Sequence, residues 1–372
     1  MELCRPTRAE INLSAFEFNF NQVRKLVGDE TKIMAVVKAN AYGHGAVEIS
    51  KLAVSLGAYY LGVAIPEEGI ELRKNEIYAP ILVFTPAFEH QIELFFKYDL
   101  TPAITSLDEA IRFNSLSEKF GKKMKCHIKI DTGMGRIGVN YKDAFEFVRK
   151  IYYEFKNLDI EGIYTHFATS DEEDKSFARL QFERFTELLK ELQSAGISIP
   201  LKHCANSGAI LDMPETYLDM VRPGVMLYGY HPSLEVLNKI ELKPVMTLKS
   251  KIAFIKEIEP GTSISYGRRF IAKEKTRIAT IPIGYADGYR RSLTNLGKVE
   301  IKGELFPVVG TVTMDQIMVD VGLNTDVKVG DDVILFGNEN LTAWDVAKLL
   351  GTIPYEVCCN VSARVPRVYV RN

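Results

Sequence analysis

Residues 33–64, IMAVVKANAYGHGAVEISKLAVSLGAYYLGVA, contain one complete strand–helix–strand repeat. The apolar runs at residues 33–37 and 60–64 have the length and composition of buried strands. Between them, residues 46–55 have the spacing of an amphipathic helix. Two strands joined by a helical crossover predict a parallel pair, because a tight turn cannot return the chain in the same direction.

The same alternation continues to about residue 230. Further apolar runs lie at residues 81–84, 103–104, 127–130, 162–165, 201–204 and 225–228, and helical patterns lie at residues 88–96, 107–120, 144–155 and 177–192. Eight strand–helix repeats predict an α/β fold, a TIM-type (β/α)8 barrel. An open, doubly wound sheet is the alternative.

The pattern changes near residue 240. From Pro244 onward, turns that contain glycine separate short runs rich in Val, Ile and Thr, at residues 245–258, 278–283, 299–302, 318–321 and 333–336. Thr342 is placed to cap a helix over residues 343–350. The sequence therefore predicts a barrel domain over residues 1–240 and a mostly β domain over residues 241–372.

The composition excludes several classes of function. The 372 residues include 46 Lys and Arg and 48 Asp and Glu, a formal net charge of -2. This balance provides no broad positive field for nucleic acid or an anionic membrane. No apolar run approaches the ~20 residues of a membrane span, the amino end lacks the pattern of a secretion signal, and the five cysteines lack CxxC spacing. We therefore expect a cytoplasmic enzyme without a metal.

Lys38 directly follows the first apolar run, and the turn after it contains Gly43 and Gly45. In a barrel, the carboxyl ends of the strands line the active-site mouth, so Lys38 is expected there. Partial desolvation at such a position lowers the pKa of a lysine and frees its amine to form a Schiff base. The alternative is a strand-end lysine that reaches into solvent.

Residues 35–45, AVVKANAYGHG, resemble the pyridoxal-phosphate lysine signature of the alanine racemases. Further matches occur in the same order and spacing at residues 129–138, 165–168, 206–207, 222–224, 265–267, 284–288, 314–315 and 354–356. The resemblance implies an isomerase that uses pyridoxal 5'-phosphate to interconvert L-alanine and D-alanine. It also implies a supply of D-alanine for peptidoglycan, the bacterial cell-wall polymer, and a homodimer whose subunits share their active sites.

The resemblance assigns cofactor-binding roles to several residues. Lys38 holds the cofactor, Arg222 faces its pyridine nitrogen, and His166 hydrogen-bonds Arg222. Because an arginine cannot accept a proton, the ring nitrogen is expected to stay unprotonated. The implied phosphate-binding positions are Tyr42, Ser207, the backbone of Gly224 and Val225, and Tyr355.

Racemisation needs a proton-transferring group on each face of the planar carbanion. The resemblance gives these catalytic roles to Lys38 and to Tyr266, which is implied to reach the site from the partner subunit. Because a phenol has a pKa near 10, positive charge or hydrogen bonding must lower the pKa of Tyr266. Without the resemblance, Tyr266 would be interpreted as a tyrosine packed at a turn between strands.

Substrate binding is also implied by the resemblance. Arg136 corresponds to the residue whose planar fork binds the substrate carboxylate, and Met314 to one whose backbone amide contacts that carboxylate from the partner chain. Lys129 matches a lysine that is carbamylated in many family members, which makes it an anion able to pair with Arg136. An ion pair between Lys129 and Asp131 is the simpler alternative.

Four residues resemble those that narrow the entrance to the pocket: Asp171, Tyr285, Arg291 and Tyr355. A narrow entrance favours alanine over larger amino acids, and Asp315 beside Met314 has no assigned role. The alternatives are a racemase of broader specificity that acts on serine, a decarboxylase on a related barrel, and a non-catalytic pyridoxal-phosphate carrier. A carrier is expected to lack the second domain and a counterpart of Tyr266.

Overall fold

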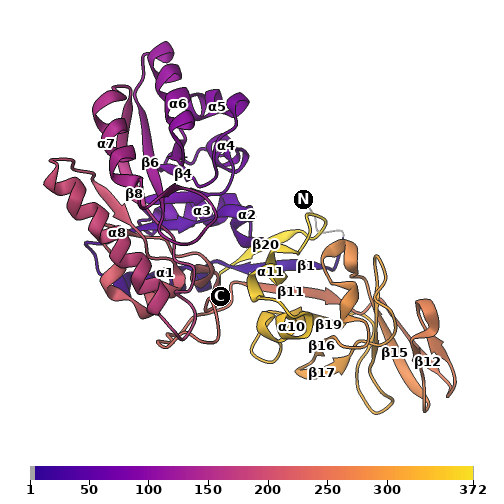
Figure 1. Cartoon of the computed structure of the whole chain (residues 1–372). Coiled ribbons are helices and arrows are strands. Elements are labelled where there is room, and N and C mark those ends of the chain that lie inside the picture. Colours follow the sequence, from indigo (N-terminus) through magenta and orange to yellow (C-terminus); the bar gives the residue numbers. More distant parts are fainter. Residues whose placement is uncertain (1–4, 372) are drawn as a thin grey trace. The chain divides into compact units, whose positions relative to one another are not determined.

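The computed structural model describes residues 5–371, which form two compact units (Figure 1). The barrel unit comprises Glu17–Ala41 and Ala46–Leu242. The β unit comprises the described residues up to Phe16, Tyr42–Gly45, and those from Lys243 onward. The predicted boundary at residue 240 lies close to Leu242, whereas the first strand of the chain lies with the carboxy-terminal segment.

Eight parallel strands form the wall of the barrel unit. Their spatial order is β10 (Met220–Val221), β2 (Lys32–Val36), β3 (Tyr60–Val63), β4 (Ile81–Val83), β5 (Thr101–Ile104), β6 (Met124–Asp131), β8 (Leu158–Tyr164) and β9 (Leu201–His203), with β7 (Val139–Asn140) paired to β6 beside this path. The Arg222 N–H donates to the Ala205 carbonyl at 2.9 Å and nearly closes the ring between β9 and β10. The predicted TIM-type barrel is confirmed, and the sequential strand order excludes the doubly wound sheet.

One predicted strand is wrong. The run at residues 225–228 was expected to be the eighth strand, but it forms the 3-10 helix η3 (Val225–Tyr228), and β10 completes the wall. All four residues of η3 are buried. A short helix buried on every side reads as a continuous apolar run, and such a run does not distinguish helix from strand.

Helices α3 to α9 follow the strands of the barrel and surround them (Figure 1). They are α3 (Ala46–Ser55), α4 (Pro66–Lys74), α5 (Ile92–Lys97), α6 (Leu107–Phe120), α7 (Ala144–Glu154), α8 (Ser176–Ser194) and α9 (Ser207–Asp212), while α1 (Leu13–Val27) precedes β2. The barrel interior is filled by a buried cluster of Met34, Tyr60, Leu82, Ala103, Tyr164, Leu201 and Met220. The barrel is therefore a packed core with its functional groups at the ends of the strands.

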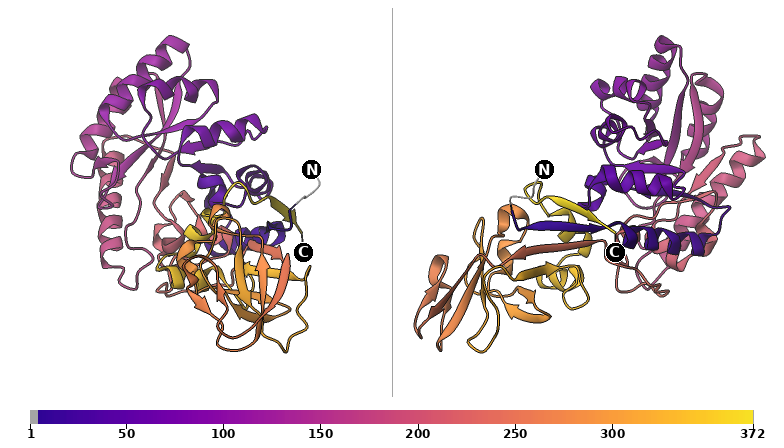
Figure 2. Two further views of the ribbon diagram at one scale, coloured as in Figure 1. Left: turned by 90° about the vertical axis from the view of Figure 1, so that its right-hand side faces the viewer. Right: turned by 180° about the vertical axis from the view of Figure 1, so that it is seen from behind.

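The β unit is built on a six-stranded sheet with the order β17 (Glu304–Pro307), β16 (Lys298–Ile301), β19 (Asp332–Phe336), β11 (Met246–Lys251), β1 (Arg8–Asn12) and β20 (Arg367–Val370). In Figure 2 the indigo β1 lies between the salmon β11 and the yellow β20. A second sheet contains β12 (Phe254–Ile258), β15 (Thr276–Ile281) and β18 (Ile317–Asp320), and β13 (Ser263–Ile264) pairs with β14 (Phe270–Ile271).

Two helices complete the β unit, α10 (Ala343–Leu350) and α11 (Pro354–Cys359). The cap predicted at Thr342 is present, because its side chain accepts the Asp345 N–H at 3.2 Å. The mostly β class of this region is confirmed. Across residues 5–371, no helix combines the length and apolar character needed to cross a membrane.

Candidate active site

Lys38 opens a turn of unusual handedness, α2 (Lys38–Tyr42). Residues 39–42 have φ angles of 52–53°, and Gly43 and Gly45 follow with φ angles of 85° and 101°. A left-handed helical conformation costs an L-residue roughly 1–2 kcal/mol. Strain of this kind persists only where the surrounding structure imposes it, and it concentrates at functional sites. The turn therefore marks the carboxyl end of β2 as a candidate site.

Side chains of the barrel unit hold this turn in place. The Glu68 carboxylate on α4 accepts the Ala39 N–H at 2.6 Å and, through its other oxygen, the Ala64 N–H at 2.7 Å. The Asn40 side chain accepts the Ala46 N–H at 2.7 Å, at the start of α3. These bonds tie the residues after Lys38 to the ends of neighbouring elements.

Arg222 directly follows β10 and is only 4% exposed. Its Nη2 donates to the carbonyls of Thr165 at 2.8 Å and Cys204 at 3.0 Å, and lies 3.3 Å from His166 Nδ1. Its Nη1 donates to His203 Nδ1 at 2.8 Å. Burial lowers the pKa of Arg222 to about 10, so the guanidinium remains charged at neutral pH. Nε and the second N–H of Nη1 donate to no group within residues 5–371.

The barrel mouth concentrates positive charge. Burial lowers the pKa of His166 well below its usual value, with further contributions from Arg222, Lys129, Arg136 and Lys38. These basic residues lie near enough to one another to disfavour an additional proton on His166. Such a cluster is suited to an anionic ligand.

Lys129 on β6 is 2% exposed. Its Nζ donates to the Ile130 carbonyl at 3.1 Å and lies 5.0 Å from the centre of the Tyr164 ring. Burial, together with the charge of Arg222, lowers the pKa of Lys129 well below its usual value. This shift makes the neutral amine, which is the nucleophilic form, more accessible than at an exposed lysine.

Asp131 ends β6 and organises the loop that leads to Arg136. Its Oδ1 accepts the N–H groups of Gly133 at 2.9 Å and Gly135 at 3.1 Å. Within the described chain, Lys129 forms no ion pair with Asp131, so the pairing considered from the sequence is wrong. Arg136 is exposed and has no hydrogen-bond or ion-pair partner among residues 5–371, which leaves its guanidinium available to an anion.

Two short turns of the barrel unit present backbone N–H groups. The Ser207 hydroxyl at the start of α9 accepts the Gly224 N–H at 3.0 Å, which joins this turn to η3. The N–H groups of Gly208, Val225 and Met226 donate to no acceptor within residues 5–371. A Cβ added at Gly208 would lie 2.8 Å from the Ser170 carbonyl. Spare N–H groups at helix starts are suited to a phosphate.

Tyr42 and Tyr355 lie together in the β unit. Their ring centroids are 6.4 Å apart with an interplanar angle of 75°. Burial raises the pKa of the Tyr42 phenol, so it remains a neutral donor. The following residue, Gly43, has no room for a side chain, because a Cβ there would lie 2.4 Å from the Cys358 carbonyl oxygen.

Tyr266 is 74% exposed in the β unit and begins η4 (Tyr266–Arg268). Its carbonyl accepts the Thr311 hydroxyl at 2.7 Å, and the preceding Ser265 has a φ of 64°. The backbone is thus fixed while the phenol projects outward. A tyrosine packed at a turn, the alternative from the sequence, does not describe this exposure.

Thr313 and Met314 lie in a loop, called the Met314 loop, that packs against the segment containing Gly284 and Tyr285. The Tyr285 N–H donates to the Thr313 carbonyl at 3.0 Å, and the Ala286 N–H donates to the Met314 carbonyl at 3.1 Å. A Cβ added at Gly284 would lie 2.3 Å from the Met314 carbonyl oxygen, so only glycine fits. Met314 is 52% exposed, and its N–H donates to nothing within residues 5–371.

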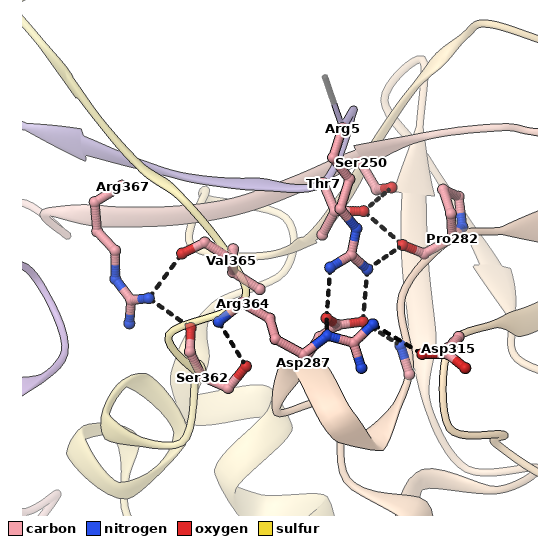
Figure 3. Close-up of polar contacts among 11 residues, drawn as sticks. Arg5, Thr7, Ser250, Pro282, Asp287, Asp315, Ser362, Arg364, Val365 and Arg367 are labelled. Carbon is pink, nitrogen blue, oxygen red and sulfur yellow. Dashed lines mark hydrogen bonds and ion pairs between the residues drawn. The ribbon is translucent and has the colours of Figure 1, made fainter. Parts of the chain in front are cut away.

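Asp287 holds the segment of residues 284–288 in place through the polar contacts of its carboxylate (Figure 3). Its carboxylate is fully buried and accepts both terminal nitrogens of Arg5, at 2.6 and 2.7 Å, and the Gly284 N–H at 3.0 Å. Arg364 lies 3.5 Å from Asp287 and pairs with Asp315 at 2.8 Å. Burial acts to raise the pKa of Asp287, but Arg5, the Gly284 N–H and Arg364 together outweigh burial and lower the pKa.

The Arg5–Asp287 pair was not predicted, and its one signal in the sequence is that glycines flank Asp287 within residues 284–288. The structure divides the predicted residues between the units. The barrel unit holds Lys38, Lys129, Arg136, His166, Asp171, Ser207, Arg222, Gly224 and Val225. The β unit holds Tyr42, Tyr266, Tyr285, Arg291, Met314, Asp315 and Tyr355. Within residues 5–371, no group of three or more His, Cys, Asp or Glu side chains is arranged to hold a metal ion.

Comparison with known proteins identifies the class. A family model described as alanine racemase, N-terminal domain, matches residues 11–232, and one described as alanine racemase, C-terminal domain, matches residues 245–369. The alanine racemase of Halothermothrix orenii is 49% identical over 370 residues, covering 99% of this chain and 97% of that protein. Alanine racemase 2 of Caldanaerobacter subterraneus subsp. tengcongensis is also 49% identical, covering 98% and 95%.

Solved structures give the same result. The alanine racemase of Clostridium difficile 630 has a TM-score of 0.96 and 45% identity, covering 100% of this chain and 97% of that chain. The alanine racemase of Bartonella henselae, solved with covalently bound pyridoxal phosphate, has a TM-score of 0.89 and 29% identity, covering 98% and 99%.

The fold and these matches define an isomerase that acts on an amino acid. The chain belongs to the alanine racemase family, whose reaction interconverts L-alanine and D-alanine. The serine racemase and carrier alternatives are not favoured by these matches.

Proposed function

We propose that the chain racemises alanine with pyridoxal 5'-phosphate held on Lys38, and that Tyr266 of the partner subunit is the second proton-transferring group. The observation that carries this proposal is the cluster of Lys38, Arg136 and Arg222 at one end of the barrel, around the neutral His166. The cluster combines an amine at the end of a strand with cations for an anionic cofactor and substrate.

The residues fit the cofactor. Arg222 has two spare N–H donors and no acceptor, which suits an unprotonated pyridine nitrogen. Ser207 and the spare N–H groups of Val225 and Met226 suit the phosphate, together with the hydroxyls of Tyr42 and Tyr355. When bound, the cofactor stabilises negative charge at the substrate Cα.

Proton movement is assigned to two side chains on opposite faces of the substrate. The Lys38 amine exchanges the Cα proton on the D side, and the Tyr266 phenol exchanges it on the L side. The exposure of Tyr266 in a single chain supports this assignment, since its phenol is free to enter the barrel mouth of a second copy. The active unit in this proposal is a homodimer with two shared sites.

Binding of the substrate carboxylate is assigned to Arg136 and to the backbone N–H of Met314 of the partner subunit. Both donors have no partner within residues 5–371. We further assign a carbamate to Lys129, formed when its neutral amine adds carbon dioxide and releases a proton. The product is an anion that can pair with Arg136 and orient its fork.

The biological role that follows is a cytoplasmic supply of D-alanine for peptidoglycan. Asp171, Tyr285, Arg291 and Tyr355 are assigned to the entrance of the pocket, where they limit the size of the substrate. This assignment predicts slower turnover of serine than of alanine.

Circular dichroism of alanine tests the proposal directly. With the full chain and added cofactor, the signal of L-alanine is expected to decay to zero, and that of D-alanine to decay to the same end point. Folded, cofactor-loaded protein that leaves both signals unchanged would overturn the proposal. Serine and a protein-free sample with cofactor serve as the substrate and background controls.

A further inference from the structure

A line of buried polar side chains runs through the barrel beneath Arg222. Arg222 Nη1 is 2.8 Å from His203 Nδ1, and His203 Nε2 is 2.9 Å from His127 Nδ1. His127 Nε2 is in turn 3.8 Å from Oε2 of Glu161. Both imidazoles are fully buried. The line therefore connects the cation at the barrel mouth to a carboxylate midway along β8.

Only one arrangement of protons satisfies this line. An arginine donates and never accepts, so His203 Nδ1 must be an acceptor and its proton must lie on Nε2. That Nε2–H donates to His127 Nδ1, which places the His127 proton on Nε2 as well. The Glu161 carboxylate, 3.8 Å from His127 Nε2, is its nearest ionic partner, and Nε2 has no hydrogen-bond partner within residues 5–371. Each imidazole is thus fixed as the same tautomer.

The backbone of β8 is adapted to this arrangement. In the pairing of β6 with β8, Cys126 lies opposite Ile160 and His127 lies opposite Gly162, so Glu161 is the extra residue of a β-bulge. Bulges re-aim side chains next to functional sites. A Cβ added at Gly162 would lie 2.4 Å from His127 Nδ1, so the glycine provides the space for the imidazole.

Glu161 supplies a fixed negative charge. It accepts the Tyr60 hydroxyl at 2.5 Å and Lys125 Nζ at 2.9 Å, and its side chain is 14% exposed. Burial acts to raise its pKa, but the nearby His127 and the hydrogen bonds from Tyr60 and Lys125 together outweigh burial and lower the pKa to about 2. Burial lowers the pKa of both histidines, and the nearby Arg222 acts in the same direction. A neutral imidazole pair between a carboxylate and a guanidinium is the result.

We propose that Glu161 is a positioning residue, which acts together with the Arg222 donor at the other end of the line to hold His127 and His203 as Nε2–H tautomers, so that His203 presents an acceptor to Arg222. The inference rests on the proposed function in that Arg222 faces the cofactor ring. Loss of the carboxylate allows His127 to carry its proton on Nδ1. Two N–H groups would then face each other between the imidazoles, so His203 must move its own proton to Nδ1. There the proton faces the N–H of Arg222, and the guanidinium loses its hydrogen bond to His203.

Nitrogen-15 NMR of the histidines in the full-length protein is the primary test. Spectra are recorded without cofactor between about pH 6 and pH 8, with signals assigned from His127→Gln and His203→Gln. In the wild-type protein, both residues are expected as neutral Nε2–H tautomers. In Glu161→Gln, at least one is expected as a mixture of tautomers, and Glu161→Asp is expected to restore the Nε2–H form in part.

A matched control is Glu109→Gln. Glu109 is another buried carboxylate of the barrel, 2% exposed, but it accepts only from Ala87 and Thr105. This variant is expected to leave both tautomers unchanged. An Nδ1–H tautomer of either histidine in the wild type, or unchanged tautomers in Glu161→Gln, would overturn the inference.

The loaded enzyme provides the functional measurement. Loss of one hydrogen bond to a charged group is expected to lower kcat of Glu161→Gln about tenfold, with less than about a twofold change in KM. The absorption maximum of the bound cofactor is expected to shift with it. Equal kcat and absorption for wild type and Glu161→Gln would contradict the positioning role. Because the NMR test needs no turnover, it separates failure of this inference from failure of the proposed racemisation.

Discussion

The barrel unit and the β unit present their candidate functional groups in opposite ways. In the barrel, Arg222 and Lys129 are 4% and 2% exposed, and burial lowers the pKa of each. In the β unit, Tyr266 and Met314 are 74% and 52% exposed. Burial within the chain sets the pKa of the barrel groups. The β-unit groups have a fixed backbone, but their functional atoms are exposed to solvent. This contrast is consistent with the proposed site, in which exposed groups of a second subunit complete the buried groups of the first.

Lys38→Ala is expected to have the largest effect on activity, because it removes the amine that is proposed to hold the cofactor in the barrel unit. The variant is expected to lose bound-cofactor absorbance and to lower kcat by more than about a thousandfold in both directions. Lys51→Ala, at an exposed lysine on α3, is the matched control and is expected to keep both properties. Turnover of Lys38→Ala near the wild-type rate would contradict the role of Lys38.

Tyr266→Phe removes only the exposed hydroxyl of the β unit. It is expected to lower kcat about a hundredfold or more, since one proton-transferring group is lost. Cofactor absorbance is expected to stay at the wild-type level, because the barrel side is intact. Racemisation at unaltered rates from both enantiomers would show that the phenol transfers no proton. Tyr78→Phe, at a tyrosine of the barrel unit with a similar exposure of 78%, controls for loss of an exposed hydroxyl.

Arg5→Ala tests how the exposed Met314 of the β unit is held in place. The segment that contacts Met314 includes Asp287, whose buried carboxylate is paired with Arg5. The fully buried Asp287 would lose its two-point partner, and unfolding free energy is expected to fall by about 3 kcal/mol. Urea unfolding measures this change. Arg8→Ala, whose partner Glu10 is partly exposed, is expected to cost less than about 1 kcal/mol. Equal losses in the two variants would remove the special role of the Arg5–Asp287 pair.

The same pair predicts a pH dependence of stability. The pKa of Asp287 is lower in the folded state than its ordinary value, so the folded protein binds fewer protons there than the unfolded chain. Its contribution is complete above the ordinary carboxyl pKa of about 4 and is lost as the pH falls through the lower folded value. Acid unfolding of the wild type is therefore expected to be steeper than that of Arg5→Ala below about pH 4. Parallel acid curves would contradict this prediction.

Lys129→Met is expected to have the smallest effect on catalysis. Loss of the proposed carbamate is expected to raise KM for alanine about fivefold, because exposed Arg136 loses one orienting partner. Thermal stability is expected to stay equal or rise, since an apolar chain of similar length replaces a buried amine. The carbamate itself is measured as a carbon-13 signal from labelled bicarbonate that the variant lacks. The absence of that signal in the wild type would contradict the modification.

The barrel was predictable from the sequence because buried parallel strands read as apolar runs between helical patterns. Every strand of the barrel wall except β10 was predicted in this way, and the short β7 beside the wall was not predicted. β10 is only two residues long, and the buried η3 beside it gave a stronger apolar run. The position of β1 was not predictable, because its pairing with β20 joins opposite ends of the chain and local periodicity carries no information on distant partners.

The candidate site shows the same limit. Lys38 could be singled out because it lies in a distinctive segment at the end of a strand, and its role stays a prediction. Glu161 was not found, because its orientation depends on a bulge that appears only when β6 and β8 are paired. The Arg5–Asp287 pair was missed for a related reason, since nothing near either residue in the sequence indicates the other. The ion pair weighed for Lys129 failed because Asp131 is used by backbone N–H groups of its own loop.

The shared site is tested most directly by mixing the Lys38→Ala and Tyr266→Phe chains and allowing subunits to exchange. In a mixed dimer, one site lacks both groups and the other has both. Random exchange makes half of the dimers mixed, so about one quarter of wild-type activity is expected to return. Activity that stays at the level of the separate variants, in samples shown to have exchanged subunits, would contradict a site completed by Tyr266 of the partner subunit.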